Sequence, residues 1–528
     1  MRMRAEQRQW VIGRSWRALE RLLGPGTARS VARWYPPLCE EAAYRAWIAT
    51  EQPSEAELDR QRRASTAGSG APLFSVIMPV FRPPLSALVA AVDSLAAQTY
   101  PHWELCVADA GPAGEASRWL AARAVADPRI KIRHLETNGG ISANSNAAIE
   151  MAQGELVAFL DQDDALEPDA LFHMADRVRA QPDVDLLYSD KDNITPGGER
   201  YAPLLKPGWS PELLLSANYI THLTVVRRAV LDRVGRLDPE MDGAQDWDLF
   251  LRITERTTRI AHVPRVLYHW RSVPTSCAST MLAKPYALAA QRRAVSSHLG
   301  RRGIAAYVAH DSSGALRLRP ARSEASSVSR IAFAADGPGW GARMNAAAAS
   351  ANGELILFWD ESLRATRAEG PEELAFWAAL PGIGAAGARV LGRGRRIERT
   401  GVVLGRGGEP QELLADARGG RWTIAGGSDW YRNLLAVGDG CFMTPRRVFR
   451  ELGGFADALH ARAAVIDYGL RVHESGLRNV HVPFVTFEGR KRWTRTFAAH
   501  EIPPRLESYR ASGDPFFSPH LSAFSQRA

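Results

Sequence analysis

Apolar runs of strand length alternate with segments of helical length between residues 74 and 160. This alternation at short spacing predicts an α/β fold, with a parallel sheet and helices on both of its faces. Further strands are expected at 186–188 and 223–226, and a further helix from Asp246 onward. The first four strands are expected at 74–79, 104–109, 130–134 and 156–160, and the helices between them at 85–97, 116–126 and 144–152.

The fourth of these strands ends in three carboxylates. Residues 156–160 are an uninterrupted apolar run, as in a strand covered on both faces, and Asp161, Asp163 and Asp164 follow it directly. In open α/β sheets, ligands bind at the carboxyl ends of the strands. In an extended chain Asp161 and Asp163 point to one side, where a divalent cation carrying substrate phosphates would relieve their repulsion. The alternative is an acidic loop that caps the next helix, with Pro168 near its first turn.

The chain also contains an internal repeat. With a shift of 199 residues, 132–161 lies on 331–360 without a gap, and 12 of these 30 positions are identical. A second block, 248–252, lies on 467–471 and keeps its first Asp and last Arg. The strands that precede residue 132 have no room in the copy. Residues 328–490 are therefore expected to be a truncated second version of the first domain's later half.

The copy has lost acids that the first version carries. Ser362 stands in place of Asp163, and Val465 stands in place of Asp246, whereas the equivalent of Asp161 is retained as an Asp. The two losses occur together. This indicates that Asp163 and Asp246 serve one reaction rather than the fold.

Composition places the chain among ordinary globular proteins. It has 528 residues, of which 45% are apolar and 23% charged, and a soft prior gives about two to four domains. No apolar run is long enough for a transmembrane helix, and no secretory signal is expected. The four cysteines form no CxxC pair, which fits a reducing compartment, so a cytoplasmic location is expected.

The net charge of +8 leaves several kinds of anionic partner open. No interleaved basic and aromatic stripe and no zinc-finger spacing is present, so nucleic acid is not expected as a partner. In the first 30 residues, Ile12, Trp16, Leu19 and Leu23 recur at helical spacing among arginines. Such a helix either packs on the main domain or lies on anionic lipid, as a peripheral contact with the cytoplasmic face of the inner membrane.

Seven ordered motifs make residues 72–310 resemble the family 2 glycosyltransferases with a GT-A fold, particularly the bacterial rhamnosyl- and O-antigen-type members. Each motif alone is a weak signal, but their order over some 240 residues is specific. The stretch 513–522 is also similar to the end of tandem proteins of this family. The motifs are 75–80, 107–109, 138–146, 154–164, 188–192, 245–248 and 268–271.

The resemblance implies a nucleotide-diphosphate sugar as donor and a divalent metal, Mg²⁺ or Mn²⁺, as cofactor. It implies that Asp109 accepts a hydrogen bond from the nucleotide base, although an Asp before Gly111-Pro112 also suits a turn. Pro79 and Phe81 would lie against the base, with Phe81 as a stacking face, unless Pro79 only ends the strand. Asn138, followed by two glycines, permits close approach of backbone to a ligand but also fits any tight turn.

By the same resemblance, Asp161 lies near the ribose and Asp163 holds the metal, which bridges the diphosphate and stabilises charge on the leaving group. His269 corresponds to a histidine that completes the metal site in many members. A His within an apolar strand is, alternatively, a core residue with satisfied hydrogen bonds.

Asp246 is expected to be the general base. An inverting transfer needs a carboxylate that takes the proton of the acceptor hydroxyl, and a helix start keeps a carboxylate ionised. The alternative is an N-cap, but Asp248 could serve as the cap instead. Trp247 either stacks on the sugar or is buried in the core.

Three positions depart from the family pattern: Ala110, Arg82 and Ser145 stand where an acid, an Asn and an Arg are common. These departures leave the reaction class intact and weaken any assignment of the nucleotide. The donor sugar is not predicted.

The sequence therefore predicts an inverting, metal-dependent glycosyltransferase that acts on a hydroxyl of a growing surface polysaccharide or a lipid-linked oligosaccharide. One alternative is a non-catalytic scaffold or regulatory subunit of a polysaccharide assembly complex. Another is a sugar nucleotidyltransferase, which would normally show a Gly-rich phosphate loop that 79–85 lacks. The expected domains are a helical extension and linker (1–70), a GT-A domain (71–310), a linker (311–327), a degenerate GT-A-like domain (328–490) and a tail (491–528).

Overall fold

The computed structural model describes residues 36–66, 70–271, 285–321, 326–334, 337, 339–405, 408–489 and 497–521. The chain divides into two compact units. The first comprises Met1–Lys206, Ile220–His298 and Ala523–Ala528, and the second comprises Pro207–Tyr219 and Leu299–Ser522. No helix within the described ranges is long and apolar enough to cross a membrane. The basic segment around Trp16 lies outside the described residues.

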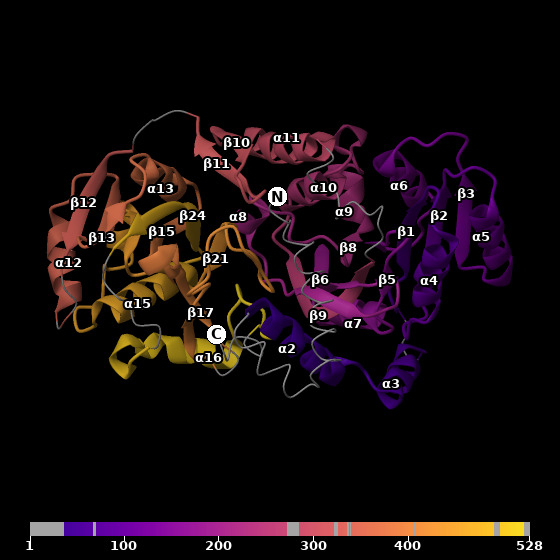
Figure 1. Cartoon of the computed structure of the whole chain (residues 1–528), viewed down its shortest axis with the longest axis horizontal. Helices are drawn as coiled ribbons and strands as arrows, with labels where there is room; N and C mark the ends of the chain where they lie inside the picture. Colours follow the sequence, from indigo (N-terminus) through magenta and orange to yellow (C-terminus); the bar gives the residue numbers. More distant parts are fainter. Residues whose placement is uncertain are drawn as a thin grey trace. The chain divides into compact units, whose positions relative to one another are not determined.

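The first unit is built on one mixed sheet with the strand order β3-β2-β1-β4-β8-β6-β9-β5, and β7 pairs with β6 (Figure 1). Strands β1 to β4 are parallel, β8 is antiparallel to both β4 and β6, and β6 is parallel to β9. The strands are β1 Phe74–Val80, β2 Trp103–Asp109, β3 Ile130–His134, β4 Leu156–Phe159, β5 Ala165–Leu166, β6 Leu186–Ile194, β7 Arg200–Leu204, β8 Thr224–Arg227 and β9 Ile260–Arg271.

Helices alternate with these strands, which confirms the predicted α/β fold; the sheet is parallel from β1 to β4, as expected, and becomes mixed at β8. β1 and β2 are buried along nearly their whole length, as their apolar runs predict. The helix expected at 144–152 begins earlier, at Ile141, because Gly140, with φ of 90°, turns the chain directly into it. The helices are α2 Pro36–Glu51, α3 Glu55–Thr66, α4 Leu85–Ala96, α5 Glu115–Ala126, α6 Ile141–Ile149, α7 Ala170–Ala180, α9 Arg228–Val234, α10 Gln245–Thr254 and α11 Pro285–Arg301.

The strand directions bring several chain segments to one edge of the first sheet. Val80 and Asp109 are neighbours at the ends of β1 and β2, and Asp161 follows β4 at the same edge. β6 runs in the direction of β4, because both are antiparallel to β8. β8 therefore begins at this edge, and His222, two residues before it, lies there as well.

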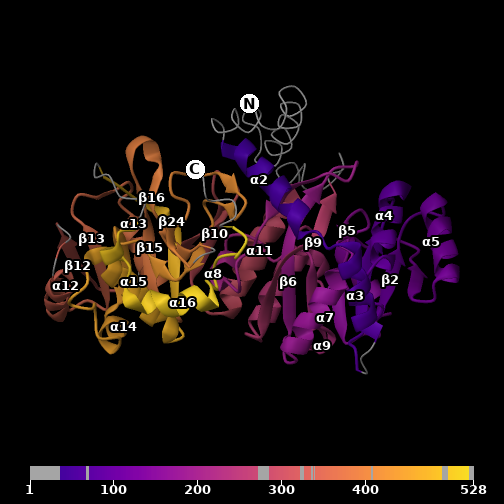
Figure 2. The same cartoon turned by 90° about the horizontal axis from the view of Figure 1, so that it is seen from below.

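The second unit repeats this sheet, and its described part has no equivalents of β3 and β2. Its main sheet has the order β12-β13-β23-β15-β24-β14, and β16 and β21 pair with β15 and β24 (Figures 1 and 2). In this order the strands have the same relative directions as β1, β4, β8, β6, β9 and β5. No described strand of the second unit takes the place of β2 or β3. The sequence predicted that the copy lacks the strands before residue 132; its described part lacks strands in place of β2 and β3, but β12 takes the place of β1.

The first strand of the second sheet occupies an unexpected place. The repeat aligns residue 331 with residue 132 of β3, but β12 pairs with β13 as β1 pairs with β4. The Gly154 N–H donates to Ser75 Oγ (2.8 Å), and the Gly353 N–H donates to Ser329 Oγ (2.9 Å). A Cβ added at Gly154 would lie 2.4 Å from the Leu73 carbonyl oxygen, and one added at Gly353 would lie 2.5 Å from the Ser329 nitrogen. The second unit therefore joins a β1-like strand directly to its helix.

The remaining elements of the second unit complete two small sheets and a hairpin. The predicted linker, 311–327, contributes β11, and the predicted tail, 491–528, contributes the buried Leu506 and Leu521. The strands are β10 Ala306–His310, β11 Leu316–Pro320, β12 Val328–Phe333, β13 Leu355–Asp360, β14 Arg364–Ala365, β15 Ile383–Leu391, β16 Ile397–Arg399, β17 Gly401–Leu404, β18 Pro410–Glu412, β19 Trp422–Thr423, β20 Gly426–Gly427, β21 Arg432–Leu434, β22 Ala436–Val437, β23 Cys441–Pro445 and β24 Arg478–Glu488. The helices are α8 Pro211–Leu214, α12 Trp340–Ala349, α13 Gly370–Ala379, α14 Arg446–Glu451, α15 Ala461–Glu474 and α16 Glu507–Ser512.

Residues 207–219 belong to the second unit although they lie far upstream of the rest of it. The carboxylate of Glu212, on α8, accepts hydrogen bonds from Arg478 Nη2 (2.8 Å) and Asn433 Nδ2 (2.6 Å). The Ser216 hydroxyl accepts the Tyr431 N–H (3.0 Å). These bonds fix the segment to β21 and β24, an arrangement that sequence position alone does not suggest.

Candidate active site

The chain turns immediately after β4, at the acids that the sequence singles out. The Asp164 N–H donates to the Asp161 carbonyl oxygen (3.3 Å), so these residues form a turn rather than the extended segment expected. Asp164 is completely buried, and its carboxylate accepts hydrogen bonds from the Tyr268 hydroxyl (2.5 Å) and the Arg271 N–H (2.8 Å). Asp164 therefore ties the turn to β9, and Asp161 and Asp163 are the partly exposed acids of this turn.

Asp161 and Asp163 lie close enough for their charges to interact. Burial raises the pKa of Asp161 to about 6, although 37% of its side chain is exposed. Burial, and then the charge of Asp161, raise the pKa of Asp163 to about 6. A cation between the two carboxylates would lower both pKa values. Their chemistry fits Mg²⁺ or Mn²⁺, which takes one or two protein carboxylates and receives its other ligands from phosphate and water.

His269 fits this cation poorly, because carboxylates occupy both sides of its ring. Its Nδ1 lies 2.6 Å from Asp192 Oδ1, and its Nε2 lies 3.0 Å from Glu167 Oε2. Burial lowers the pKa of His269, but these two carboxylates outweigh it and raise the pKa above its usual value. In this arrangement neither ring nitrogen is open to a metal. Among the described side chains, no three His, Cys, Asp or Glu residues converge as a metal cage.

Asp246 is the second residue of α10, which agrees with the predicted helix start. At this end the helix dipole favours a carboxylate. Its Oδ1 accepts the N–H of Trp247 (2.8 Å), and the Trp247 side chain is buried, with 4% exposed. Burial lowers the pKa of His222 to about 4, and the Asp246 charge acts in the opposite direction. Asp246 therefore lies within electrostatic reach of the sheet edge on which His222 and Asp161 stand.

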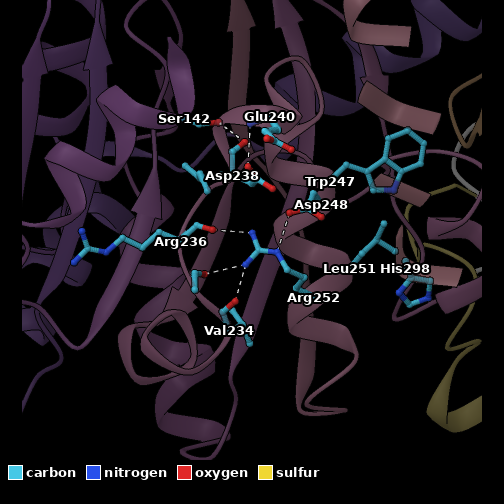
Figure 3. Close-up of polar contacts among 12 residues, drawn as sticks. Ser142, Val234, Arg236, Asp238, Glu240, Trp247, Asp248, Leu251, Arg252 and His298 are labelled. Carbon is cyan, nitrogen blue, oxygen red and sulfur yellow. Dashed lines mark hydrogen bonds and ion pairs between the residues drawn. The ribbon is translucent and has the colours of Figure 1, made fainter. Parts of the chain in front are cut away.

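Asp248 has a different part, which Figure 3 shows. Its carboxylate accepts a hydrogen bond from Arg252 Nε (2.8 Å), and the Arg252 guanidinium also donates to the carbonyls of Val234 and the next two residues. In the second unit, Asp467 and Arg471 form the same pair (2.9 Å), and Arg471 donates to carbonyls that follow α14. Retention of this Asp in the repeat thus reflects its structural contact.

Asp109 is the last residue of β2 and is buried. Its Oδ1 accepts the Gly111 N–H (3.0 Å), and its Oδ2 lies 3.2 Å from His134 Nδ1. The turn contact is the alternative that the sequence left open, and the second oxygen faces only a largely exposed His among the described residues. One carboxylate can therefore support the turn and still present an oxygen to a ligand.

Pro79 lies near the end of β1, and Phe81 follows the strand with 38% of its surface exposed. The Phe81 N–H donates to Gln162 Oε1 (2.8 Å), and Gln162 Nε2 donates to the Phe81 carbonyl oxygen (3.3 Å). These two bonds hold the backbone of Phe81 beside the acidic turn. Gln162 is a residue whose part in the site the sequence does not reveal.

Asn138 lies in the loop before α6, and its side chain is used within that loop. Its Oδ1 accepts hydrogen bonds from the Gly140 N–H (3.1 Å) and Asn144 Nδ2 (2.9 Å). These contacts match the tight-turn alternative. A ligand contact by the same side chain stays a prediction.

His222 and Tyr268 also lie in the site; Tyr268 begins the motif at 268–271, whereas His222 has no clear signature in the sequence. The His222 ring stacks on the Tyr268 ring, with centroids 4.8 Å apart, and its Nε2 lies 3.6 Å from Asp161 Oδ2. A lone His ahead of an apolar strand is usually a packing residue. Only the strand order, which places β8 between β4 and β6, reveals its position.

A mixed α/β sheet with acids at a strand end and at the start of a nearby helix defines an α/β enzyme whose site lies at the carboxyl edge of the sheet. Residues 75–235 match the family model described as "Glycosyl transferase family 2". The chain therefore carries a family 2 glycosyl transferase domain. The match agrees with the predicted family over residues 75–235.

Two relatives extend the similarity beyond this domain. The chain is 32% identical over 513 residues to "Uncharacterized protein y4gI" of Sinorhizobium fredii, which covers 84% of this chain and 55% of that protein. It is 31% identical over 571 residues to "O-antigen biosynthesis protein RfbC" of Myxococcus xanthus, which covers 96% of this chain and 44% of that protein. The chain thus spans about half the length of these relatives.

Among solved structures, the chain is similar to Staphylococcus aureus TarS residues 1–349 in complex with UDP-GlcNAc. The identity is 20%, the TM-score is 0.36, and the match covers 43% of this chain and 66% of that one.

Proposed function

We propose that the first unit is an inverting, metal-dependent glycosyltransferase. It transfers a sugar from a nucleoside-diphosphate donor to a hydroxyl of a growing surface polysaccharide or lipid-linked glycan. One observation carries the proposal: Asp161 and Asp163 lie together after β4 within the matched domain, and Asp246, at the start of α10, interacts electrostatically with His222, whose Nε2 lies 3.6 Å from Asp161. The second unit, which has Ser362 and Val465 at two of the equivalent positions, is proposed to be non-catalytic.

In this proposal the end of β1 and β2 binds the nucleotide. Asp109 accepts a hydrogen bond from the base through Oδ2, and the exposed Phe81 ring, beside Pro79, supplies a stacking face. Asp161 lies toward the ribose. Asp163, with Asp161 beside it, would hold a divalent cation, which when bound neutralises charge on the diphosphate leaving group. The proposal gives His269 no part as a ligand.

Asp246 takes the proton of the acceptor hydroxyl as that oxygen attacks the anomeric carbon. The start of α10 keeps this carboxylate ionised, and Asp248 is already committed to Arg252. Because Asp246 and Asp163 act on the nucleophile and the leaving group respectively, attack from the side opposite the diphosphate inverts the anomeric configuration.

A thermal-shift panel tests this function. Nucleotide sugars with different bases and sugars, such as UDP-glucose, GDP-mannose and dTDP-rhamnose, are added with and without Mn²⁺ or Mg²⁺. At least one is expected to raise Tm, and more strongly with the cation than without it. A flat response to every nucleotide sugar and to the free nucleoside diphosphates would rule out the proposed function.

A further inference from the structure

His222 lies near groups that the proposed function assigns to both ends of the reaction. Its Nε2 lies 3.6 Å from the Oδ2 of Asp161, which the proposed function places near the nucleotide and diphosphate. It also lies within electrostatic reach of Asp246, the proposed base. In a transfer with inversion, the sugar must lie between the leaving diphosphate and the base. His222 is therefore in the region that the transferred sugar must occupy.

The distance between the His222 and Asp161 side chains leaves room for a ligand hydroxyl that would bridge them. A distance of 3.6 Å is too long for a direct N–H···O hydrogen bond. A sugar hydroxyl could bridge it by accepting from the His222 Nε2–H and donating to the Asp161 carboxylate. Within the described part of the chain, His222 Nδ1 is buried and meets no hydrogen-bond partner, so the proton belongs on Nε2.

The structure holds His222 firmly in this position. Its ring stacks on Tyr268, with an interplanar angle of 23°, and the Tyr268 hydroxyl is fixed by Asp164. The completely buried Lys206 ammonium donates to the carbonyl oxygens of His222 (2.8 Å) and Ile220 (2.6 Å). A side chain whose ring and backbone are both fixed is suited to bind a ligand in one geometry.

We infer that His222 binds the transferred sugar, donating a hydrogen bond from Nε2 to a sugar hydroxyl that also bonds Asp161. This inference rests on the proposed function and adds a contact that distinguishes the nucleotide sugar from the nucleotide alone. His222 is a binding residue in this account, and the proton transfer stays with Asp246.

Calorimetry on the full chain tests the inference with the nucleotide sugar that gives the largest thermal shift and with its nucleoside diphosphate, both with Mn²⁺. His222→Phe keeps a ring on Tyr268 and removes both nitrogens. It should weaken nucleotide-sugar binding roughly five- to tenfold and leave nucleoside-diphosphate binding within about twofold. His222→Gln, which returns an amide N–H near the Nε2 position, should restore part of the loss. His173→Phe, which removes a histidine paired with Asp169, is the matched control and should change neither affinity.

Equal weakening of both ligands by His222→Phe would overturn the inference, as would unchanged binding of both. In either case a wild-type chain that still binds the nucleotide sugar keeps the proposed function standing. A wild-type chain that binds neither ligand contradicts the proposed function itself and removes the inference with it.

Discussion

At the scale of single residues, neighbouring acids on one turn have different parts. Asp164 is buried and both of its oxygens accept hydrogen bonds, so it supports the turn. Asp163, one residue earlier, has a raised pKa because of burial and the nearby Asp161. The charges of Asp161 and Asp163 therefore repel each other, and a bound cation or a proton would relieve this repulsion.

Asp163→Asn is expected to stabilise the cation-free protein at pH 8. A carboxyl with a native pKa near 6 and an unfolded pKa near 4 destabilises the fold once it ionises, above about pH 6, and has no such effect below about pH 4. The variant should gain about 1 kcal/mol at pH 8, after allowance for solvent screening, and little at pH 4. Denaturant unfolding at the two pH values measures this.

The same variant should lose the additional thermal shift that Mn²⁺ gives with a nucleotide sugar. Wild-type protein should lose this cation effect gradually as the pH falls through about 6, because protons then compete for Asp163 and Asp161. A cation effect that persists in Asp163→Asn would remove Asp163 from the proposed metal site.

The strand-end acids and the acid at the helix start can be predicted from the sequence because each adjoins an element with a strong local pattern. Asp246 begins its helix as expected. His222 and Gln162 cannot be found in this way, because their neighbours in space, Asp161 and Phe81, lie on other elements. His269 shows the converse: its motif position suggested a ligand, whereas its carboxylate neighbours occupy both nitrogens.

At the scale of elements, the two units share two sets of contacts, one made by an Asn and one by an Asp–Arg pair. Asn146 on α6 exchanges hydrogen bonds with the backbone of Leu237 (2.8 and 3.1 Å), and Asn345 on α12 does the same with Phe455 (2.8 Å for both). The Arg of each Asp–Arg pair, on α10 and α15, donates hydrogen bonds to backbone carbonyls of the segment after the preceding helix. The residues that the second unit retains thus make framework contacts, whereas the proposed catalytic acids Asp163 and Asp246 have no acidic equivalents in it.

Arg252→Met should destabilise the first unit by roughly 3 kcal/mol, because it leaves the buried Asp248 carboxylate without its ion pair. Arg471→Met is the matched variant in the second unit. It should cost less, since Asp467 also pairs with Arg505 (3.1 Å). Denaturant unfolding of both variants provides the comparison. A larger loss of stability for Arg471→Met than for Arg252→Met would contradict this account of the two Asp–Arg pairs.

The strand order could be predicted only in part. Alternation of strands and helices locates β1 to β4, because each run is apolar and short. The repeat did not predict the place of β12. The sequence alignment matches β12 to β3, whereas the pairing of β12 with β13 puts it in the position of β1.

At the scale of the whole molecule, the second unit includes a segment from the middle of the first unit's sequence. Residues 207–219 lie within the range predicted as one domain, yet Glu212 bonds to Arg478 and Asn433 of the second unit. Such long-range pairing carries no local signal, so the sequence could not reveal it.

Glu212→Ala should loosen the second unit. It removes the carboxylate that Arg478 and the buried Asn433 share, at a cost of about 2 kcal/mol. Hydrogen exchange should quicken in β21 and β24 while β1 and β2 keep their protection. Glu372→Ala, at an exposed position on α13, is the control. Unchanged exchange in β21 and β24 would show that Glu212 does not secure this segment.

The full chain should bind one nucleotide sugar rather than two, because the second unit has lost the equivalents of Asp163 and Asp246 and its described part lacks strands in place of β2 and β3. Calorimetric stoichiometry measures this directly. A second cation-dependent site that survives Asp163→Asn would contradict the assignment of the second unit as non-catalytic.

The measurement that tests the central claim most directly is the turnover of Asp246→Asn with the nucleotide sugar that the panel selects and a lipid-linked glycan acceptor. The account predicts that the variant folds, binds the donor within about twofold of the wild-type affinity, and loses at least about 100-fold in kcat. Wild-type turnover by this variant would show that Asp246 is not the general base and would contradict the proposed mechanism.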